Sequence, residues 1–250
     1  MHQNFDGIVK PNIAEAKLLA AIDPARVPQH IAVIMDGNGR WAKRRGKARI
    51  FGHREGSESV KAIIDTCARM EVKAITLYAF STENWKRPKT EISGLMSMLK
   101  RVLKRELKTL HGNNIRFQAI GDLNGLAPDV QAELAAATEF TRENTGMVLS
   151  VALNYGGRAE IVEAAKKAAE KGEISEETIE QNLYTNGLPD VDLIIRTSGE
   201  FRVSNFLLWQ IAYSEIYVTP VLFPDFRRPQ IFEAIIDYQK RDRRYGGIKK

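Results

Sequence analysis

The stretch that decides the fold reads Ile31-Ala32-Val33-Ile34-Met35-Asp36-Gly37-Asn38-Gly39-Arg40-Trp41. Its apolar half is typical of a buried parallel strand, so its polar half falls at the carboxyl end of that strand. Open α/β sheets bind their ligands in the crevice at this edge. Gly37 and Gly39 let the backbone approach a ligand closely, and the helix that we expect next would turn its N-terminus towards an anion. The stretch therefore indicates a site for an anionic group.

Asp36 narrows the chemistry of that site, because a carboxylate repels an anion. A bridging divalent cation resolves the conflict. Mg²⁺ fits best, since proteins commonly hold it with one or two carboxylates plus the phosphates of a substrate. Asp-Gly-Asn can also form an ordinary turn. With Arg40 and Trp41 attached to it, we interpret the stretch as a metal-assisted phosphate or diphosphate site.

The length and composition of the chain limit its possible domain organisation and cellular setting. The 250 residues, 44% of them hydrophobic, suffice for one substantial core. We expect a single domain over 1–250, with an N-terminal helical extension over 1–28 and a C-terminal helix and basic tail over 229–250. One cysteine, Cys67, excludes an intramolecular disulfide and fits a reduced, cytoplasmic setting. We find no signal-peptide pattern and no apolar run of about 20 residues.

The chain is basic, with a formal net charge of +6 and a pI of about 9.3. This charge favours an acidic substrate or an anionic membrane surface as partner. Nucleic acid is not expected, because aromatic residues do not interleave with the basic runs as they do in RNA-binding sheets.

Strand-like and helix-like patterns alternate along the chain. We predict strands at 29–35, 73–80, 115–120, 147–153, 191–196 and 215–219. We predict helices at 12–22, 40–46, 54–70, 90–111, 128–143, 158–171, 175–184 and 229–240. The alternation indicates an α/β fold with a central six-stranded, largely parallel sheet flanked by helices.

The helix predicted at 90–111 is amphipathic. Its apolar side carries Ile92, Leu95, Met96, Leu99, Val102, Leu103, Leu107 and Leu110, and lysine and arginine fill the other side. Ordinary core packing explains such a side, and one wall of an apolar ligand tunnel is the alternative.

Three further segments place polar side chains beside predicted elements of the sheet. They contribute Ser81, Asn84, Trp85 and Arg87 after the second strand, Arg196, Arg202 and Ser204 after the fifth, and Arg49 and His53 near the start of a helix. Two guanidinium groups and a hydroxyl can converge on one anion. The structural alternative for Arg196 is an internal ion pair, with Asp190, Asp192 and Glu200 as candidate partners.

Several common phosphate motifs are missing. Neither a Walker-type P-loop nor G-x-G-x-x-G occurs, and the aspartate-rich helical motif of trans-type prenyl synthases is absent too. A haloacid-dehalogenase-type phosphatase needs a nucleophilic aspartate two residues before Asp36, where this chain has Ile34.

The motifs together resemble those of the cis-prenyltransferases, and among them the bacterial undecaprenyl diphosphate synthases. The matching pieces are Met35 to Ala42, Gly52-His53, Ala79 to Pro88, Asn154-Tyr155-Gly156-Gly157, Arg196 to Gln210, Glu215 and Pro224-Asp225-Phe226. The resemblance implies a homodimeric α/β enzyme with an apolar tunnel. Such an enzyme adds isopentenyl diphosphate repeatedly to farnesyl diphosphate in cis configuration. Its product, undecaprenyl diphosphate, is the precursor of the lipid carrier for cell-wall glycans.

The resemblance also implies the role of each site residue. Asp36 would bind Mg²⁺, with Glu215 as a second metal contact, and Asp36 and Asn84 would be the catalytic residues. The substrate-binding residues would be Gly37, Asn38, Gly39, Arg40, Trp41, Arg49, His53, Ser81, Thr82, Glu83, Trp85, Arg87, Arg196, Arg202 and Ser204. Of these, Arg196, Arg202 and Ser204 would hold isopentenyl diphosphate. The acceptor of the proton lost from isopentenyl C2 stays open among Asn38, Ser81, Asn84 and the released diphosphate.

Two other functions remain alternatives at this point. A non-catalytic partner subunit, as in heteromeric eukaryotic relatives, loses motif residues that this chain retains. A phosphatase or nucleotide-binding protein is the alternative from another class. The resemblance leaves the product length and the primer open, and it allows peripheral contact of a cytoplasmic protein with the inner face of the membrane. Leu149 in the strand 147–153 is our candidate for the tunnel floor, with ordinary core as its alternative.

Overall fold

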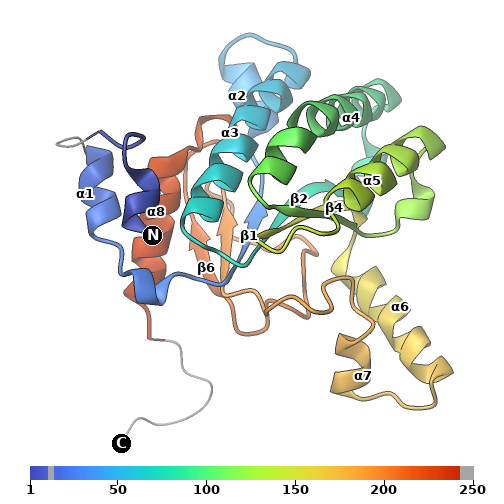
Figure 1. Ribbon diagram of the computed structural model, residues 1–250. Coiled ribbons are helices and arrows are strands. Elements are labelled where there is room, and N and C mark those ends of the chain that lie inside the picture. The colour runs from blue at the N-terminus through green and yellow to red at the C-terminus, as the bar shows by residue number, and fades with distance from the viewer. Residues whose placement is uncertain (11–13, 243–250) are drawn as a thin grey trace, which may run out of the picture.

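A single parallel sheet organises the molecule (Figure 1). The computed structural model describes residues 1–10 and 14–242. Its strands are β1 (His30–Ile34), β2 (Ala74–Ser81), β3 (Arg116–Ile120), β4 (Val148–Tyr155), β5 (Leu193–Arg196) and β6 (Glu215–Val218). They pair in the order β3-β4-β2-β1-β5-β6, and every pair is parallel. The six predicted strands are confirmed, and none differs in its bounds by more than two residues.

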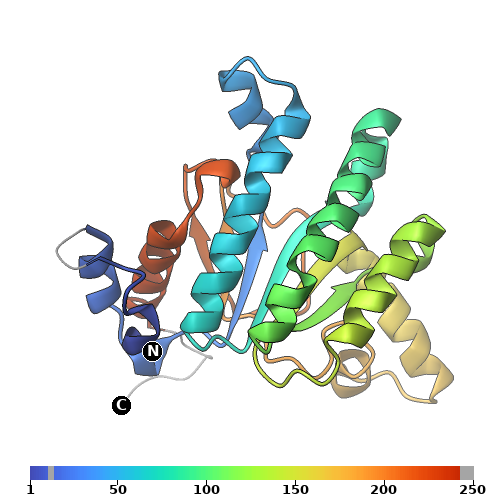
Figure 2. The same ribbon diagram turned by 45° about the horizontal axis from the view of Figure 1, so that its top comes forward.

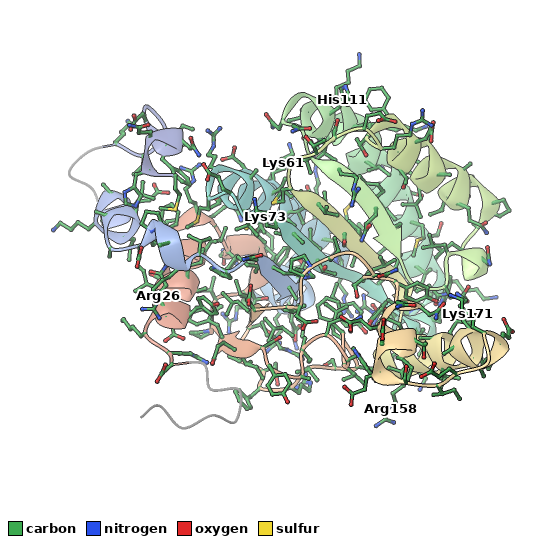
Figure 3. All side chains as sticks on the ribbon, turned by 60° about the horizontal axis from the view of Figure 1, so that its bottom comes forward. Arg26, Lys61, Lys73, His111, Arg158 and Lys171 are labelled. Atoms are coloured by element: carbon green, nitrogen blue, oxygen red, sulfur yellow. The ribbon has the colours of Figure 1, made fainter. Side chains whose placement is uncertain are left out.

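Helices cover both faces of the sheet. They are α1 (Ala14–Ala20), α2 (Asn38–Arg44), α3 (Arg49–Arg69), α4 (Lys89–Gly112), α5 (Pro128–Phe140), α6 (Gly157–Glu170), α7 (Glu176–Glu180) and α8 (Arg228–Gln239). Figures 1 and 2 show α3, α4 and α5 on one face and α6 on the other. Figure 3 places His111, at the end of α4, on the opposite side of the sheet from Arg158, in the first turn of α6, and Lys171, which follows α6. Within the described residues no helix is both long and apolar enough to cross a membrane.

The predicted helices are confirmed, although α5 ends three residues and α7 four residues earlier than predicted. The start of α3 is the instructive difference. We predicted the start of this helix at residue 54. Glycine, here Gly52, is unfavourable in a helix interior. The helix begins at Arg49 instead. A Cβ at Gly52 would lie 2.0 Å from the backbone oxygen of Asn38, so the glycine lets α3 pack directly against the first residue of α2. Tertiary packing therefore overrides the local preference.

Strand β4 lies between β2 and β3, and all eight of its residues are buried. Leu149, Val151 and Leu153 join the hydrophobic cluster under α3 and α4, whereas Ala152 and Tyr155 join the cluster on the other face. The side chains therefore alternate up to Leu153, as the strand geometry predicts, and the left-handed Asn154, with a φ of 46°, interrupts the alternation so that Tyr155 lies on the same face as Ala152.

The N-terminal extension packs against α8. The rings of Phe5 and Phe232 meet edge to face with centroids 5.5 Å apart, and Arg228 lies 3.4 Å from Glu15. The Gln239 side chain donates a hydrogen bond to the backbone oxygen of Asp23. The extension is thus part of the same fold. Residues 243–250 of the predicted tail, and residues 11–13 near the predicted first helix, lie outside the described residues.

The strand order changes direction between β1 and β5, because β2 to β4 lie on one side of β1, whereas β5 and β6 lie on the other. The chain runs from β1 through α3 to β2 on one side, and it enters β5 from α6 and α7 on the opposite face. Ligands of open α/β sheets bind at such a switch point, outside the carboxyl ends of the strands. Ile34 is in register with Arg196, so the residues after β1 emerge beside the end of β5.

Gly52 provides a test of this packing. We expect Gly52→Ala to lower the free energy of unfolding by about 3 kcal/mol, because the added methyl group collides with backbone rather than with a flexible side chain. Gly112→Ala is the matched control, since nothing lies within 4 Å of its Cβ position. The control should change stability by less than about 1 kcal/mol. Denaturant titration measures both, and equal stabilities for the two variants would contradict the packing argument.

Candidate active site

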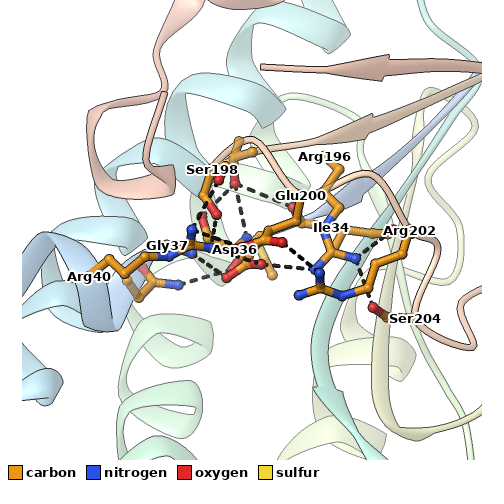
Figure 4. Close-up of polar contacts among 12 residues, drawn as sticks. Ile34, Asp36, Gly37, Arg40, Arg196, Ser198, Glu200, Arg202 and Ser204 are labelled. Atoms are coloured by element: carbon orange, nitrogen blue, oxygen red, sulfur yellow. Dashed lines mark hydrogen bonds and ion pairs between the residues drawn. The ribbon is translucent and has the colours of Figure 1, made fainter. Parts of the chain in front are cut away.

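The polar residues that follow β1 and end β5 meet at the carboxyl edge of the sheet (Figure 4). Asp36 Oδ2 lies 2.9 Å from Arg196 Nη2 and 3.3 Å from Arg40 Nη2. Arg196 is only 4% exposed, and a guanidinium so buried needs a paired charge. Asp36 supplies that charge, and it replaces Asp190, Asp192 and Glu200, the partners that the sequence suggested.

The loop after β5 wraps around the same guanidinium. Arg196 Nη1 donates to the backbone oxygen of Arg202 at 2.5 Å and to Ser204 Oγ at 2.7 Å. Its Nε is buried and has no partner within the described residues. Ser204 has a φ of 51°, a left-handed conformation that costs energy in a residue with a side chain. Arg196 therefore keeps an unpaired Nε–H and holds a strained loop in place.

A second carboxylate, Glu200, braces the cations at the mouth of this site. Its Oε1 accepts from Arg40 Nη1 at 3.1 Å, and its Oε2 accepts from Arg202 Nη1 at 2.6 Å. Arg40 also donates to the backbone oxygen and the hydroxyl of Ser198. Three arginines thus surround two carboxylates, which leaves a net positive site.

Asp36 is charged at neutral pH. Burial by itself raises the pKa of its carboxyl, but the hydrogen bond and charge of Arg196, with the charge of Arg40, outweigh burial and hold the pKa below its usual value. The backbone N–H of Gly37 adds a hydrogen bond to Oδ1 at 2.7 Å. Each oxygen therefore keeps a lone pair for a cation while it accepts these bonds.

A further cationic group lies where α3 and α4 begin. Glu91 Oε1 accepts a hydrogen bond from Arg87 Nη1 at 3.1 Å and forms an ion pair with Arg49, whose Nε lies 3.2 Å away. Burial, followed by the charges of Arg87 and Arg49, lowers the pKa of His53 to about 4. Its Nε2 is buried without a partner in the described part of the chain. His53 is therefore neutral at pH 7 and can offer one N–H to an anion.

One cavity joins these polar groups to the hydrophobic interior. It has a volume of about 1150 Å³, above the roughly 300–1,000 Å³ of most small-molecule pockets. Its polar end is lined by Asp36, Gly37, Asn38, Gly39, Arg40, Arg49, His53, Ser81, Glu83, Asn84, Arg87, Arg196 and Ser204. Its apolar part is lined by Leu77, Leu95, Met96, Leu99, Val102, Leu103, Leu110, Phe117, Leu149, Val151 and Leu153. The apolar side of α4 is therefore a tunnel wall as well as core.

Four predicted substrate-binding residues do not line this cavity. Trp41 is buried, and its Nε1 donates to Asp225 Oδ1 at 2.7 Å while Arg45 lies over the ring at 4.0 Å. Trp85 is 42% exposed and donates to Asn154 Oδ1 at 2.7 Å. The other two are Thr82, beside Gly156, and the exposed side chain of Arg202. Both tryptophans brace neighbouring loops, and only side-chain directions, which sequence does not give, could have shown this.

The expectation for Glu215 needs correction. Glu215 is the first residue of β6, in register with Leu193, and so lies at the amino edge of the sheet, opposite to Asp36. Its carboxylate pairs with Arg241 at 2.9 Å. Within this chain it does not share a metal with Asp36. The predicted strand 215–219 already indicated this position. The first residue of a parallel strand lies at the amino edge of the sheet, and Asp36 was expected at the carboxyl edge.

Sequence reasoning also missed two bracing residues, Glu91 and Glu200. An acidic residue in the first turn of a helix is common for its effect on the helix dipole, so Glu91 carried no distinct signal. Glu200 was considered only as a partner of Arg196, whereas it pairs with Arg40 and Arg202.

Asp36 fits a Mg²⁺ site of a particular kind. Across residues 1–10 and 14–242, no three His, Cys, Asp or Glu side chains are close enough to hold a metal by themselves. Mg²⁺ is usually held by one or two carboxylates together with substrate phosphates and water. A charged Asp36 at the polar end of the cavity matches that pattern, provided that the ligand brings phosphates.

Comparisons with known proteins agree with this geometry. A family model of undecaprenyl diphosphate synthases, within the prenyltransferases, matches residues 34–246. An isoprenyl transferase of Heliobacterium mobile is 52% identical over 251 residues, covering 97% of this chain and 96% of that protein. A (2E,6E)-farnesyl-diphosphate-specific ditrans,polycis-undecaprenyl-diphosphate synthase of Pasteurella multocida is 46% identical over 240 residues, covering 93% of this chain and 100% of that protein.

A solved structure extends the likeness to the fold. The crystal structure of lavandulyl diphosphate synthase from Lavandula x intermedia, in complex with dimethylallyl diphosphate, superposes with a TM-score of 0.87 at 39% identity. The match covers 89% of this chain and 100% of that chain.

The ion pair of Asp36 gives a test that needs no substrate. We expect Asp36→Asn to lower the free energy of unfolding by about 3 kcal/mol, because it leaves the buried Arg196 without a counter-charge. Inorganic diphosphate should stabilise the variant more than the wild type. Asp129→Asn is the control, since Asp129 pairs with Lys100 on the surface and its loss should lower the melting temperature far less than Asp36→Asn does. Thermal unfolding with and without diphosphate measures all three proteins, and equal losses in both variants would contradict the assignment.

Proposed function

The chain belongs to the undecaprenyl diphosphate synthase family of prenyltransferases, and we propose that it condenses isopentenyl diphosphate repeatedly onto farnesyl diphosphate in cis configuration. The product is undecaprenyl diphosphate, the precursor of the lipid carrier for cell-wall glycans. One observation supports this most strongly. A strongly cationic mouth opens directly into an apolar cavity of about 1150 Å³, and a prenyl diphosphate is the ligand that has both of these characters.

The cations form two groups, which suit two diphosphates. The allylic diphosphate binds between the backbone of Gly37 to Gly39 and the side chains of Arg40, Arg49 and His53. The first backbone N–H groups of α2 are unpaired by helix geometry and add donors there. Isopentenyl diphosphate binds Arg196, Arg202 and Ser204 on the other side of Asp36. Arg202 has an exposed side chain and can turn inward without breaking any buried contact.

The chemical step breaks the allylic carbon–oxygen bond and joins that carbon to the terminal alkene carbon of isopentenyl diphosphate. Negative charge grows on the leaving diphosphate, and fixed guanidinium groups with the neutral His53 stabilise it. Mg²⁺, held by Asp36 and the phosphates, supplies further charge neutralisation when it is bound. A diphosphate that takes Arg196 as its partner leaves the Asp36 carboxylate free for that role.

A proton must then leave C2 of the isopentenyl unit. Asn38, Ser81 and Asn84 line the cavity there, but none of them is a strong base. Asn84 Oδ1 accepts a hydrogen bond from the backbone N–H of Ser81 at 3.3 Å. The side-chain N–H₂ group of Asn84 is therefore available to donate to a phosphate oxygen. The released diphosphate is the acceptor that this arrangement favours.

The assembly state and location follow from the family resemblance. We propose a homodimer that works in the cytoplasm with peripheral contact to the membrane. Phe201, next to Arg202, is 80% exposed, and a partner subunit that covers it would lie beside the isopentenyl diphosphate group.

Turnover with labelled isopentenyl diphosphate tests the function. Incorporation of several labelled units into a farnesyl primer, with cis double bonds in the product, is the expected result. Release of phosphate without incorporation would instead identify a phosphatase, and absence of any turnover in the presence of Mg²⁺ would identify a non-catalytic relative.

The assignment of the two diphosphate groups can be tested by substitution. We expect Arg196→Ala and Arg202→Ala to raise the KM for isopentenyl diphosphate about ten- to hundredfold, because each removes a charged hydrogen bond worth about 1.5–3 kcal/mol. Arg142→Ala, which removes a surface arginine paired with Glu139, is the control and should leave both KM values unchanged. A rise confined to the KM for farnesyl diphosphate would mean that the two groups are exchanged.

Leu149 tests the tunnel. It is 3% exposed and lines the cavity from β4, so we expect Leu149→Ala to lengthen the product and spare the first condensation. Leu134 on α5 is equally buried but does not line the cavity, and Leu134→Ala should cost about 2–5 kcal/mol of stability without changing chain length. Product chromatography and melting curves measure both variants. A less stable Leu149→Ala enzyme with an unchanged product would show that Leu149 is ordinary core.

A further inference from the structure

The connection between α2 and α3, together with the end of α2 and the start of α3, forms a basic segment that we call the basic turn and define as residues 43–54. It contains Lys43, Arg44, Arg45, Lys47, Arg49 and Arg54 and no acidic residue. Residues 43–51 are all exposed. Both ribbon views show this turn projecting beyond the rest of the molecule (Figures 1 and 2). Its cations are therefore concentrated on a protruding edge.

Ion pairs with other residues of the chain neutralise only part of the positive charge of the basic turn. Arg45 pairs with Asp225 at 3.6 Å, and Arg49 pairs with Glu91. Lys43, Arg44 and Arg54 form no ion pair within the described ranges, 1–10 and 14–242. The turn therefore presents uncompensated positive charge to an external partner.

The same turn exposes two large apolar side chains. Ile50 is 39% exposed and Phe51 is 47% exposed, and they follow the basic residues directly in the chain. Neither belongs to the cavity lining. A pair of exposed apolar residues flanked by cations is the composition of a segment that lies in a membrane interface.

The position of the turn links it to the cavity. Lys43 and Arg49 line the cavity mouth, and Ile50 reaches within 3.4 Å of the Cβ position of Gly94 on α4. The turn thus forms one rim of the opening from which an apolar chain must leave. Because a long prenyl chain is unfavourable in water, its exit calls for an apolar phase at that rim. This step of the argument rests on the proposed function.

We propose that the basic turn docks the protein on an anionic lipid bilayer, with Ile50 and Phe51 inserted among the headgroups. Charge favours this partner, since each basic residue near an anionic surface strengthens binding about fivefold. Repulsion between like charges disfavours the basic turn of a second copy of the chain as the partner. The apolar pair favours a bilayer over a polyanion, which would leave Phe51 in water. The docked protein has its cavity mouth facing the lipid.

Sedimentation with lipid vesicles tests the proposal on the full chain. The probes are vesicles of phosphatidylcholine with and without phosphatidylglycerol. The charge variant is Arg44→Glu with Lys47→Glu, and its control is Lys166→Glu with Lys171→Glu, on and beside α6 on the other face of the sheet. The apolar variant is Phe51→Ser, and its control is Val162→Ser, a residue of α6 that is 55% exposed. None of these residues lines the cavity.

The wild type and both control proteins should bind the anionic vesicles and ignore the neutral ones. The charge variant should bind at least thirtyfold more weakly, and Phe51→Ser about tenfold more weakly. The basic residues among 243–250 are unchanged in every variant, so this loss isolates the turn. Because the charge variant changes only exposed side chains, it keeps the test valid if Phe51→Ser folds poorly.

Three results would overturn the proposal. They are unaltered vesicle binding by both turn variants, equal binding to neutral vesicles, and release of the wild type by inorganic diphosphate at constant ionic strength. Vesicle binding is measured without turnover, so the two proposals can fail separately. Binding through the turn by a protein that does not use isopentenyl diphosphate would refute only the function, and an active enzyme that ignores the vesicles would refute only the docking.

Discussion

The ion pair between Asp36 and Arg196 is the interaction on which the carboxyl edge of the sheet depends. A guanidinium that is 4% exposed is expensive without a counter-charge, and the parallel register of β1 with β5 brings one to it at 2.9 Å. The same guanidinium fixes the loop after β5 through Arg202 and Ser204. An anionic ligand therefore competes with Asp36 for Arg196. Under the proposed function, that exchange would couple diphosphate binding to the release of a carboxylate suited to Mg²⁺.

The rest of the site contains two further groups of a carboxylate with arginines, and their side chains are less buried than that of Arg196. Glu91 pairs with Arg49 and Arg87, and Glu200 pairs with Arg40, so these three cations are held at fixed positions before any ligand arrives. The exposed Arg202 is the exception, since it has to turn inward. Such preorganisation spares the reorganisation that charge development in the transition state would otherwise demand. The apolar side of α4 and the face of β4 with Leu149 continue the same cavity. The lining of the cavity thus suits a ligand with an anionic head and a long hydrocarbon tail, as the proposed function requires.

Much of this was predictable from sequence. Alternating strand and helix patterns predicted all six strands, and the rule for parallel sheets placed Asp36 and Arg196 at one edge. The partner of Arg196 was not predictable, because sequence does not give the strand order that puts β1 beside β5. The start of α3 was hidden by Gly52, whose tertiary contact outweighs helix propensity. Glu215 was misplaced by following a motif instead of its own predicted strand.

The most direct test of this account is a structure of the protein with a non-reactive thio analogue of farnesyl diphosphate and Mg²⁺. The account predicts the diphosphate within hydrogen-bonding distance of Arg40, Arg49 and His53, with the metal on Asp36. The prenyl chain should lie between β4 and α4 against Leu149 and Leu153. A diphosphate bound outside the mouth, or a prenyl chain on the α6 face of the sheet, would contradict the central claim.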